Sequence, residues 1–207
     1  MIKELKDHPF LTGFGSHPLG WMNATVAYFP VLIYLFAKIH GSRNILEIGT
    51  DHGYSSYYLA AAAKENGGMY YGVDILQDMC DRVDKMLTGA DLPHKMICAN
   101  THELDEIDFM DRIDIAFLDG EHNTRAVEHE VELVYPLLNG VGWGYIFVHD
   151  IVDMGNADIW WKLQSDPRFE KLGMNPNYGL GILRKMEGLD YADVARRFGV
   201  LGNVDKQ

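Results

Sequence analysis

The sequence predicts an α/β fold: a doubly wound, mainly parallel seven-stranded sheet that is closed by one antiparallel strand from a C-terminal hairpin. Three observations favour this fold. Short apolar runs alternate with helical patterns from residue 44 to residue 148, glycine-containing turns separate them, and two strand-like runs near the C-terminus lie too close together for a helix to connect them. Strand and helix that alternate at this interval indicate right-handed crossovers between parallel strands.

The parallel part of the sheet is expected to follow a helical N-terminal segment. Residues 22–39 carry apolar side chains on all sides, which is typical of a buried helix rather than of an amphipathic surface helix. The alternation that follows predicts strands at 44–48, 69–74, 95–99, 113–118 and 145–148, and helices at 55–66, 77–88 and 125–138.

The C-terminal third departs from this alternation. Residues 169–174 and 179–185 are typical of strands, and only residues 175–178 separate them. A parallel crossover needs about a dozen residues, so the two strands are expected to form an antiparallel hairpin. We therefore expect an N-terminal helical segment, a core domain and a C-terminal tail helix, at residues 1–43, 44–185 and 186–207.

Composition and charge exclude several classes of function. The 207 residues are 47% hydrophobic and 23% charged, as in a globular protein with its own core. A formal charge of -12 argues against nucleic acid or a membrane surface as a partner. Two cysteines are too few for a disulfide framework or a cysteine-based zinc site. The charged first residues lack the apolar core of a secretion signal, so a cytoplasmic protein is expected.

The turn after the first strand is the first candidate binding site. Gly49 and Gly53 allow a tight turn and close approach of the backbone to a ligand. Aligned with the dinucleotide fingerprint, Asp51 and Tyr54 occupy the second and third glycine positions, and a carboxylate there repels a pyrophosphate. A nicotinamide-dependent oxidoreductase is therefore disfavoured. S-adenosylmethionine has no phosphate, and Asp74, at the end of the second strand, is placed to accept both of its ribose hydroxyls.

This pattern of Glu47, Gly49, Gly53 and Asp74 resembles the class I S-adenosylmethionine-dependent methyltransferases, whose sheet is Rossmann-like. The resemblance extends over residues 44–185, and the family's antiparallel seventh strand comes from a C-terminal hairpin. It implies that Asp74 binds the ribose. The other cofactor-binding residues that it implies lie at the methionine end and beside the adenine: Glu47, Gly49, Gly53, Tyr54, Ser55, Asn100, Thr101 and Asp119.

Two acids follow the fourth and fifth strands, which should be neighbours about 5 Å apart. The segments that contain Asp119 and Asp150 resemble those of the branch that contains catechol O-methyltransferase and the macrocin-type sugar O-methyltransferases. The resemblance implies that both acids hold Mg²⁺ or another divalent cation, and that Asp119 alternatively meets the cofactor amine. Two positions depart from the catechol enzyme: its third metal ligand, an Asn, is Ile151 here, and its catalytic Lys is His122.

His122 and His149 stand beside the two acids in the sequence. An imidazole whose pKa lies near 6.5 can accept the proton of an alcohol or phenol during methyl transfer, so either is a candidate base. The sequence therefore predicts methyl transfer from S-adenosylmethionine to a small molecule, at oxygen and with metal assistance left open. The alternatives are a nicotinamide-dependent oxidoreductase and a non-catalytic cofactor-binding protein of the same fold. A homodimer is also left open.

Overall fold

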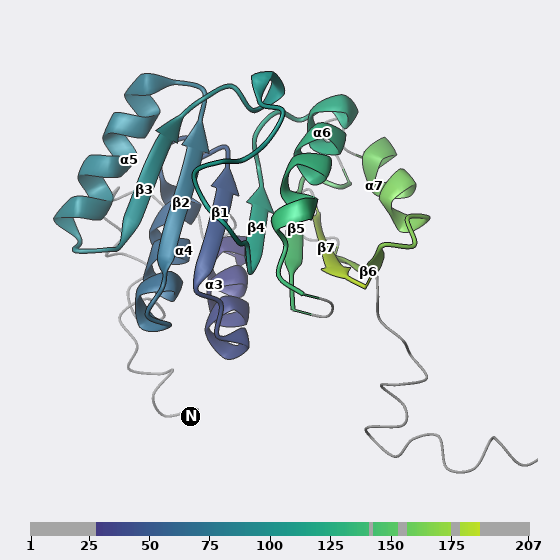
Figure 1. Cartoon of the computed structure of the whole chain (residues 1–207), viewed down its shortest axis with the longest axis horizontal. Coiled ribbons are helices and arrows are strands. Elements are labelled where there is room, and N and C mark those ends of the chain that lie inside the picture. Colours follow the sequence, from purple (N-terminus) through teal and green to yellow (C-terminus); the bar gives the residue numbers. More distant parts are fainter. Residues whose placement is uncertain (1–27, 141–142, 153–156, 175–178, 187–207) are drawn as a thin grey trace, which may run out of the picture.

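In the computed structural model, residues 28–140, 143–152, 157–174 and 179–186 are described. Their seven strands form one sheet in the order β3-β2-β1-β4-β5-β7-β6 (Figure 1). The strands are β1 (Asn44–Ile48), β2 (Met69–Asp74), β3 (His94–Cys98), β4 (Ile115–Leu118), β5 (Tyr145–His149), β6 (Phe169–Met174) and β7 (Leu180–Lys185). The helices are α3 (Tyr28–His40), α4 (Tyr54–Glu65), α5 (Gln77–Gly89), α6 (Thr124–Val134) and α7 (Ala157–Gln164), with short 3-10 turns at Thr101–Glu103 and Tyr135–Leu137.

The strand pairing confirms the predicted fold class. The first five strands pair in parallel, with β1 between β2 and β4. The last two pair antiparallel, and β7 lies between β5 and β6. The C-terminal hairpin therefore supplies the antiparallel strand, because the second strand of a hairpin must run opposite to the first.

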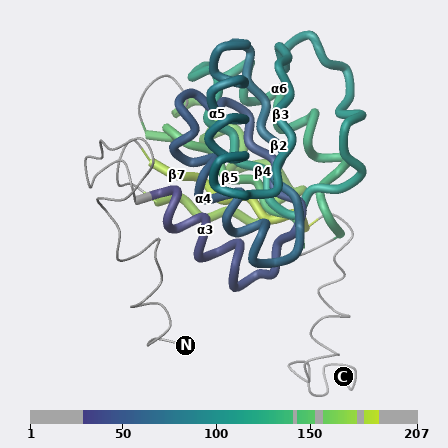
Figure 2. The backbone as a smooth tube through the Cα atoms, turned by 90° about the vertical axis from the view of Figure 1, so that its left-hand side faces the viewer, coloured from purple at the N-terminus to yellow at the C-terminus, as the bar shows by residue number. Residues whose placement is uncertain are grey.

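Two apolar layers hold the helices against the sheet. In β1, Ile45 points toward the layer formed with α3, α4 and α5, and Leu46 points toward the layer formed with α6 and α7. This alternation follows from the two-residue period of a strand. The side view in Figure 2 shows α3, α4 and α5 stacked together along the sheet. Burial on both faces explains why a central strand such as β4 is continuously apolar, whereas β3, at the edge of the sheet, is not.

Most element boundaries lie within two residues of the prediction, with two informative differences. The helix predicted to end at residue 138 ends at Val134, because a 3-10 turn with Pro136 near its start follows it. Helix α7 was not predicted: its eight residues bury only Ile159 and Leu163, too few apolar positions for a helical period. The expected N-terminal residues 1–27, link 175–178 and tail helix lie outside the described residues.

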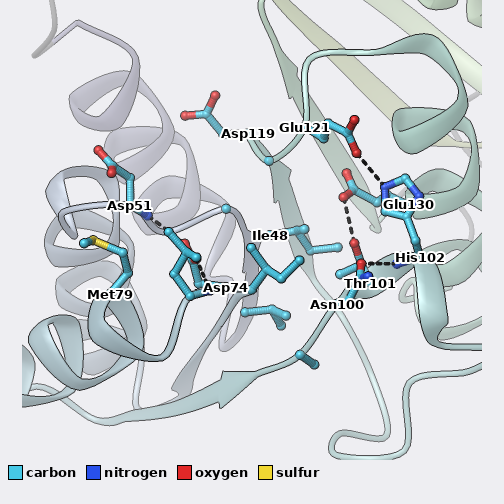
Figure 3. Close-up of a pocket in the computed structure, with 16 residues that line it drawn as sticks. Ile48, Asp51, Asp74, Met79, Asn100, Thr101, His102, Asp119, Glu121 and Glu130 are labelled. Carbon is cyan, nitrogen blue, oxygen red and sulfur yellow. Dashed lines mark hydrogen bonds and ion pairs between the residues drawn. The ribbon is translucent and has the colours of Figure 1, made fainter.

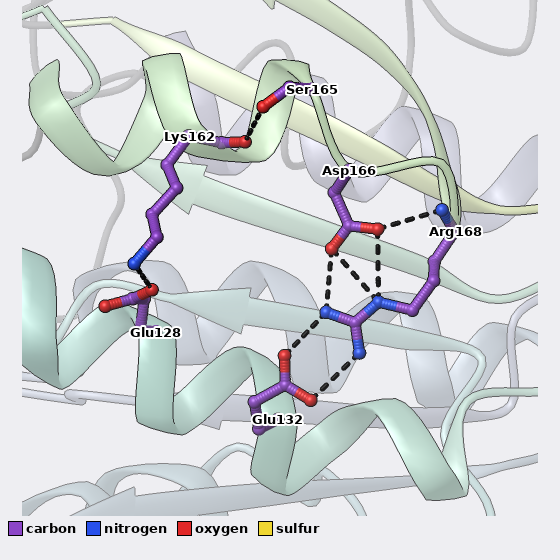
Figure 4. A network of polar contacts seen from close by, with 6 residues as sticks. All are labelled: Glu128, Glu132, Lys162, Ser165, Asp166 and Arg168. Atoms are coloured by element: carbon purple, nitrogen blue, oxygen red, sulfur yellow. Dashed lines mark hydrogen bonds and ion pairs between the residues drawn. The ribbon is translucent and has the colours of Figure 1, made fainter.

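Ion pairs connect α6 to the link between α7 and β6, which carries Asp166 and Arg168 (Figure 4). The Arg168 guanidinium bonds both carboxylate oxygens of Glu132, at 2.9 and 2.5 Å, and also the carboxylate of Asp166. It lies 4.6 Å from the ring centre of Tyr135. A planar guanidinium suits this two-pronged, stacked arrangement better than an ammonium would. In the part of the chain that the structure describes, no helix combines the length and apolar character needed to cross a bilayer.

Candidate active site

The turn between β1 and α4 requires glycine at its first position. Gly49 has a φ of 87°, in the left-handed region, and its N–H donates to the carbonyl of Val73 at 2.9 Å. A Cβ atom here would lie 2.4 Å from the carbonyl oxygen of Asp119. Gly53, with a φ of 80°, closes the turn as the N-cap of α4. The turn therefore lies directly against the end of β4, and a side chain at its first position would push the two apart.

Asp74, the last residue of β2, holds this turn in place. Its Oδ2 accepts hydrogen bonds from the N–H groups of Thr50 and Asp51, both at 2.9 Å, and from the Thr50 hydroxyl at 3.2 Å. Its Oδ1 accepts from the N–H of Leu76 at 3.0 Å. A carboxylate oxygen has about two lone-pair sites, so Oδ1 keeps the capacity for a second donor. Asp74 can thus fix the turn and still receive a hydroxyl of a ligand.

A cavity of about 430 Å³ lies beside this turn, at the carboxyl ends of the parallel strands (Figure 3). The ends of four strands and the helices α5 and α6 line it, through residues 48, 49 and 51, 73–76 and 79, 99–102, 119–121, and 130. Its volume falls in the usual range for small-molecule sites. Open α/β sheets bind ligands at this edge, where the strand order reverses beside β1.

The end of the cavity opposite Asp74 is built from the segment after β3 and from α6. Asn100 starts a 3-10 turn, and its side chain accepts the N–H of His102 at 3.1 Å. Thr101 is buried, and its hydroxyl donates to Oε1 of Glu130 at 3.1 Å. Its carbonyl lies 2.9 Å from Nε2 of His129. Asn100 and Thr101, both expected beside an adenine, therefore line the cavity together.

Asp119, which also lines the cavity, connects it to a second polar group. Its Oδ1 lies 2.8 Å from Nδ1 of His149, which is 3.1 Å from Oδ1 of Asp150. The other carboxylate oxygen of Asp150 lies 2.8 Å from Nδ1 of His122. The four side chains form one continuous polar chain, His122–Asp150–His149–Asp119, which we call the acid–imidazole chain. The structure thus brings together the two predicted acids and the two predicted bases.

The environment of His149 sets its charge. Burial disfavours the charged imidazole, but the hydrogen bond to Asp119 and the charges of Asp119 and Asp150 outweigh it and raise the pKa of His149. The ring of Phe29, from α3, meets the imidazole edge-on with the ring centres 5.1 Å apart. His149 is thereby held on one side by an aromatic ring and on the other by two carboxylates.

Comparison with known families assigns the chain to one of them. The model of a family described as a methyltransferase domain matches residues 46–151, from the first strand to the residue after Asp150. The chain belongs to this methyltransferase family. Among curated proteins, the sequence comparison found no match to this methyltransferase.

Solved structures share the fold of this methyltransferase. The O-methyltransferase TomG from Streptomyces achromogenes, in complex with SAM, superposes with a TM-score of 0.64 at 18% identity, over 77% of this chain and 80% of that chain. A protein from Staphylococcus aureus that is described as a putative caffeoyl-CoA O-methyltransferase gives 0.63 at 21%, over 76% and 82%. The O-methyltransferase from Bacillus cereus, in complex with SAH, gives 0.62 at 19%, over 81% and 84%.

Four of the residues expected to bind cofactor lie outside the lining of the cavity: Glu47, Gly53, Tyr54 and Ser55. Glu47 is fully buried in the layer of α4, where its carboxylate accepts the hydroxyls of Ser55, Ser56 and Tyr70. Burial, partly offset by these three bonds, raises the pKa of Glu47 to about 7. The hydroxyl of Ser55 donates to Glu47 in this network, and the ring of Tyr54 packs against Tyr58. In this structure these residues brace the methyltransferase's turn from behind.

The acid–imidazole chain offers three converging donors for a divalent cation. One donor atom each from Asp119, His149 and Asp150 lies within 4.8 Å of the others. Two oxygens and one imidazole nitrogen suit Mn²⁺, Fe²⁺ or Zn²⁺ better than Mg²⁺, which prefers oxygen alone. The buried Ile151 side chain has no donor atom, and His149 supplies the third donor of this cluster. The donor set therefore fits a divalent cation, and within the expectation of Mg²⁺ or another divalent cation it favours one that accepts a nitrogen ligand.

The sequence analysis missed Glu130 as a lining residue of the methyltransferase's cavity. Glu130 is 2% exposed, and its neighbours on the buried face of α6 are Val127, Val131 and Val134. A carboxylate in the middle of an apolar helical stripe costs free energy unless something pairs with it. That position in the pattern is the signal that could have found it.

Proposed function

We propose that this chain transfers the methyl group of S-adenosylmethionine to an oxygen atom of a small molecule. One observation carries the proposal: Asp119 belongs both to the cavity at the sheet edge and to the acid–imidazole chain. A nucleoside seated in the cavity would place its reactive end at Asp119, next to groups that can take a proton.

The cavity suits a nucleoside without phosphates. Asp51 and Asp74 both line it, and the side chain of Asp51 lies at its exposed mouth (Figure 3). Two carboxylates repel a pyrophosphate but attract a positive sulfonium and accept ribose hydroxyls. Two of the similar structures are complexes with SAM and with SAH, which supports the same ligand here.

The acid–imidazole chain supplies the proton transfer. When bound, S-adenosylmethionine supplies a methyl group on positively charged sulfur. The acceptor oxygen forms its bond to that methyl carbon as the carbon–sulfur bond breaks, and the hydroxyl proton passes to an imidazole. We assign this role to His122, whose side chain is 37% exposed against 20% for His149. Asp150 orients the His122 ring through its contact with Nδ1.

A divalent cation is the other means of weakening the acceptor O–H bond. Asp119, His149 and Asp150 would hold it, and when bound it would lower the pKa of a coordinated hydroxyl. In that case His149 ligates with Nδ1 instead of bridging the two acids. Metal assistance is therefore part of the proposal only as a variant, and the turnover experiment below separates the two.

Calorimetry on the full chain tests the cofactor. We expect S-adenosylmethionine and S-adenosylhomocysteine to bind with micromolar affinity, and NAD to show no heat of binding. Binding of NAD alone would overturn the proposal in favour of an oxidoreductase.

Turnover tests the reaction. Release of S-adenosylhomocysteine is measured with a panel of phenols, catechols and sugars, in EDTA and with Mg²⁺, Mn²⁺ or Zn²⁺. Turnover in EDTA would assign the proton to His122 without a metal, and turnover restored by Mn²⁺ or Zn²⁺ would assign the cation. Cofactor binding without turnover on any acceptor would favour a non-catalytic binding protein.

A further inference from the structure

Glu130 carries a carboxylate that the proposed methyl transfer does not use. It is 2% exposed, yet it lines the cavity, and Figure 3 shows it across the cavity from Asp74. Its Oε1 accepts the hydroxyl of Thr101, whereas no donor from the described residues reaches Oε2. A buried carboxylate oxygen without a donor costs free energy, so a ligand that brings a donor to it would be bound more tightly.

Gly120 keeps this carboxylate open toward the cavity. A Cβ atom at Gly120 would lie 3.3 Å from Oε1 of Glu130 and 3.5 Å from Cγ2 of Ile48. The φ of Gly120 is not in the left-handed region, so its backbone conformation does not itself require glycine. The absence of a side chain at Gly120 leaves space between the cavity and Glu130.

The other polar groups at this end already bond one another. Asn100 accepts the N–H of His102 with Oδ1 and donates from Nδ2 to Glu103, at 3.1 and 3.0 Å. The Thr101 hydroxyl donates to Glu130. Burial, with the nearby charges of Glu121 and Asp119, raises the pKa of Glu130 to about 7. Above that pH the carboxylate is ionised and can only accept, so it favours a ligand that donates over one that only accepts.

The apolar wall of the cavity faces the same space. Ile75 and Leu76 line the cavity and are 61% and 56% exposed, which is unusual for two large apolar neighbours at the rim of a site. A flat ring system would cover them. With the ribose at Asp74, such a ring would extend along Ile75 toward Thr101 and would meet Glu130 with its far edge.

We propose that Glu130 is the residue that recognises the exocyclic amino group of the purine, by accepting its N–H at Oε2. This inference rests on the nucleoside cofactor of the proposed function and adds to it the group that distinguishes adenine from a 6-oxo purine. A 6-oxo base presents a carbonyl oxygen in place of the amine, and two acceptors facing each other repel.

The same contacts predict the behaviour of Glu130→Gln. The Thr101 hydroxyl needs an acceptor, so it will bond the amide oxygen of the glutamine, which places the amide NH₂ where Oε2 now lies. That NH₂ opposes an amine and suits a carbonyl. The variant should therefore reverse the preference between the two bases rather than merely weaken binding.

Calorimetry on the full chain compares S-adenosylhomocysteine with its deaminated analogue, S-inosylhomocysteine. We expect wild type to prefer the adenosyl compound by about tenfold or more, and Glu130→Gln to bind the inosyl compound at least as tightly as the adenosyl one. Glu128→Gln is the matched control, since Glu128 is on the same helix but pairs with Lys162 away from the cavity (Figure 4). It should keep the wild-type ratio.

Each outcome decides the question. Equal affinity of wild type for the two compounds overturns the role of Glu130 without any variant, so the test does not depend on whether Glu130→Gln folds. A variant that keeps the wild-type ratio also overturns it, even if its affinity or stability falls. If wild type binds neither compound, the proposed function itself fails, and this inference fails with it.

Discussion

Replacing Asp74 by alanine tests how the cofactor turn is held. The substitution removes the acceptor of three backbone N–H groups, those of Thr50, Asp51 and Leu76. We expect two effects: a less stable fold, because the turn loses its anchor, and weaker binding of S-adenosylhomocysteine, because a ribose hydroxyl loses its acceptor.

The size of the stability loss follows from the exposure of each donor. Thr50 is 2% exposed, so its N–H is left buried without an acceptor, at a cost of about 1–3 kcal/mol. Asp51 and Leu76 are exposed, so water replaces the lost bond and each costs less than about 1 kcal/mol. The free energy of unfolding should therefore fall by about 1–5 kcal/mol in total.

Urea denaturation measures the first effect and calorimetry with S-adenosylhomocysteine the second, where we expect about a tenfold or greater loss of affinity. Asp81→Ala is the matched control: Asp81 lies on exposed α5, accepts a hydrogen bond from Gln77, and should change neither quantity. Unchanged stability together with unchanged affinity in Asp74→Ala would refute the reasoning.

Three further substitutions probe other parts of the molecule. Gly49→Ala, with a Cβ 2.4 Å from a carbonyl oxygen at a φ of 87°, should lower the free energy of unfolding by about 2–5 kcal/mol in urea denaturation. Burial raises the pKa of Glu47 to about 7 from an ordinary value of 4.5, so the folded chain keeps a proton that the unfolded chain loses, and wild-type stability should fall as pH rises between these values. Glu47→Gln should remove up to about 3 kcal/mol of that fall. His122→Gln should lower kcat about a hundredfold while cofactor affinity stays within about twofold.

Each of these expectations has an outcome that contradicts it. A fully stable Gly49→Ala would show that the ends of β1 and β4 can separate at little cost. A Glu47→Gln variant with the pH dependence of wild type would show that the pKa of Glu47 is not raised by folding. Some dependence of stability on pH is expected to remain in the variant, because burial also raises the pKa of Glu130. A wild-type kcat in His122→Gln would mean that His122 is not the proton acceptor, and would assign that role to His149 or to a route through a bound metal.

The sheet was predictable because its signal is local. Apolar runs such as 44–48 and 69–74 have exactly the bounds of β1 and β2, since glycine and charged residues end them. The hairpin was predictable from a link too short for any other connection. The short α7 was not, because its helical state depends on packing against α6 rather than on its own pattern.

The site was predictable only in part, because spacing gives positions and not directions. Asp74 and Asp119 fell at strand ends, and strand ends of a parallel sheet meet at one edge. Glu47 also fell near that edge, but the two-residue period of β1 turns its side chain toward α4 and away from the cavity. Whether Asp150 would contact His122 or His149 depended on the left-handed φ of 58° at Asp150, which no spacing reveals.

The C-terminal hairpin supports the loop that carries Asp150. At Gly179, where the hairpin enters β7, a Cβ atom would lie 2.5 Å from Cγ2 of Val152 and 2.7 Å from Cγ1 of Ile151. No described residue of β6 or β7 lines the cavity. A change in the hairpin would nevertheless shift the loop through this contact. Under the proposed function, two proteins with the same cofactor cavity could therefore methylate different acceptors. The substitutions responsible would lie in the C-terminal hairpin, far along the sequence from the residues that line the cavity.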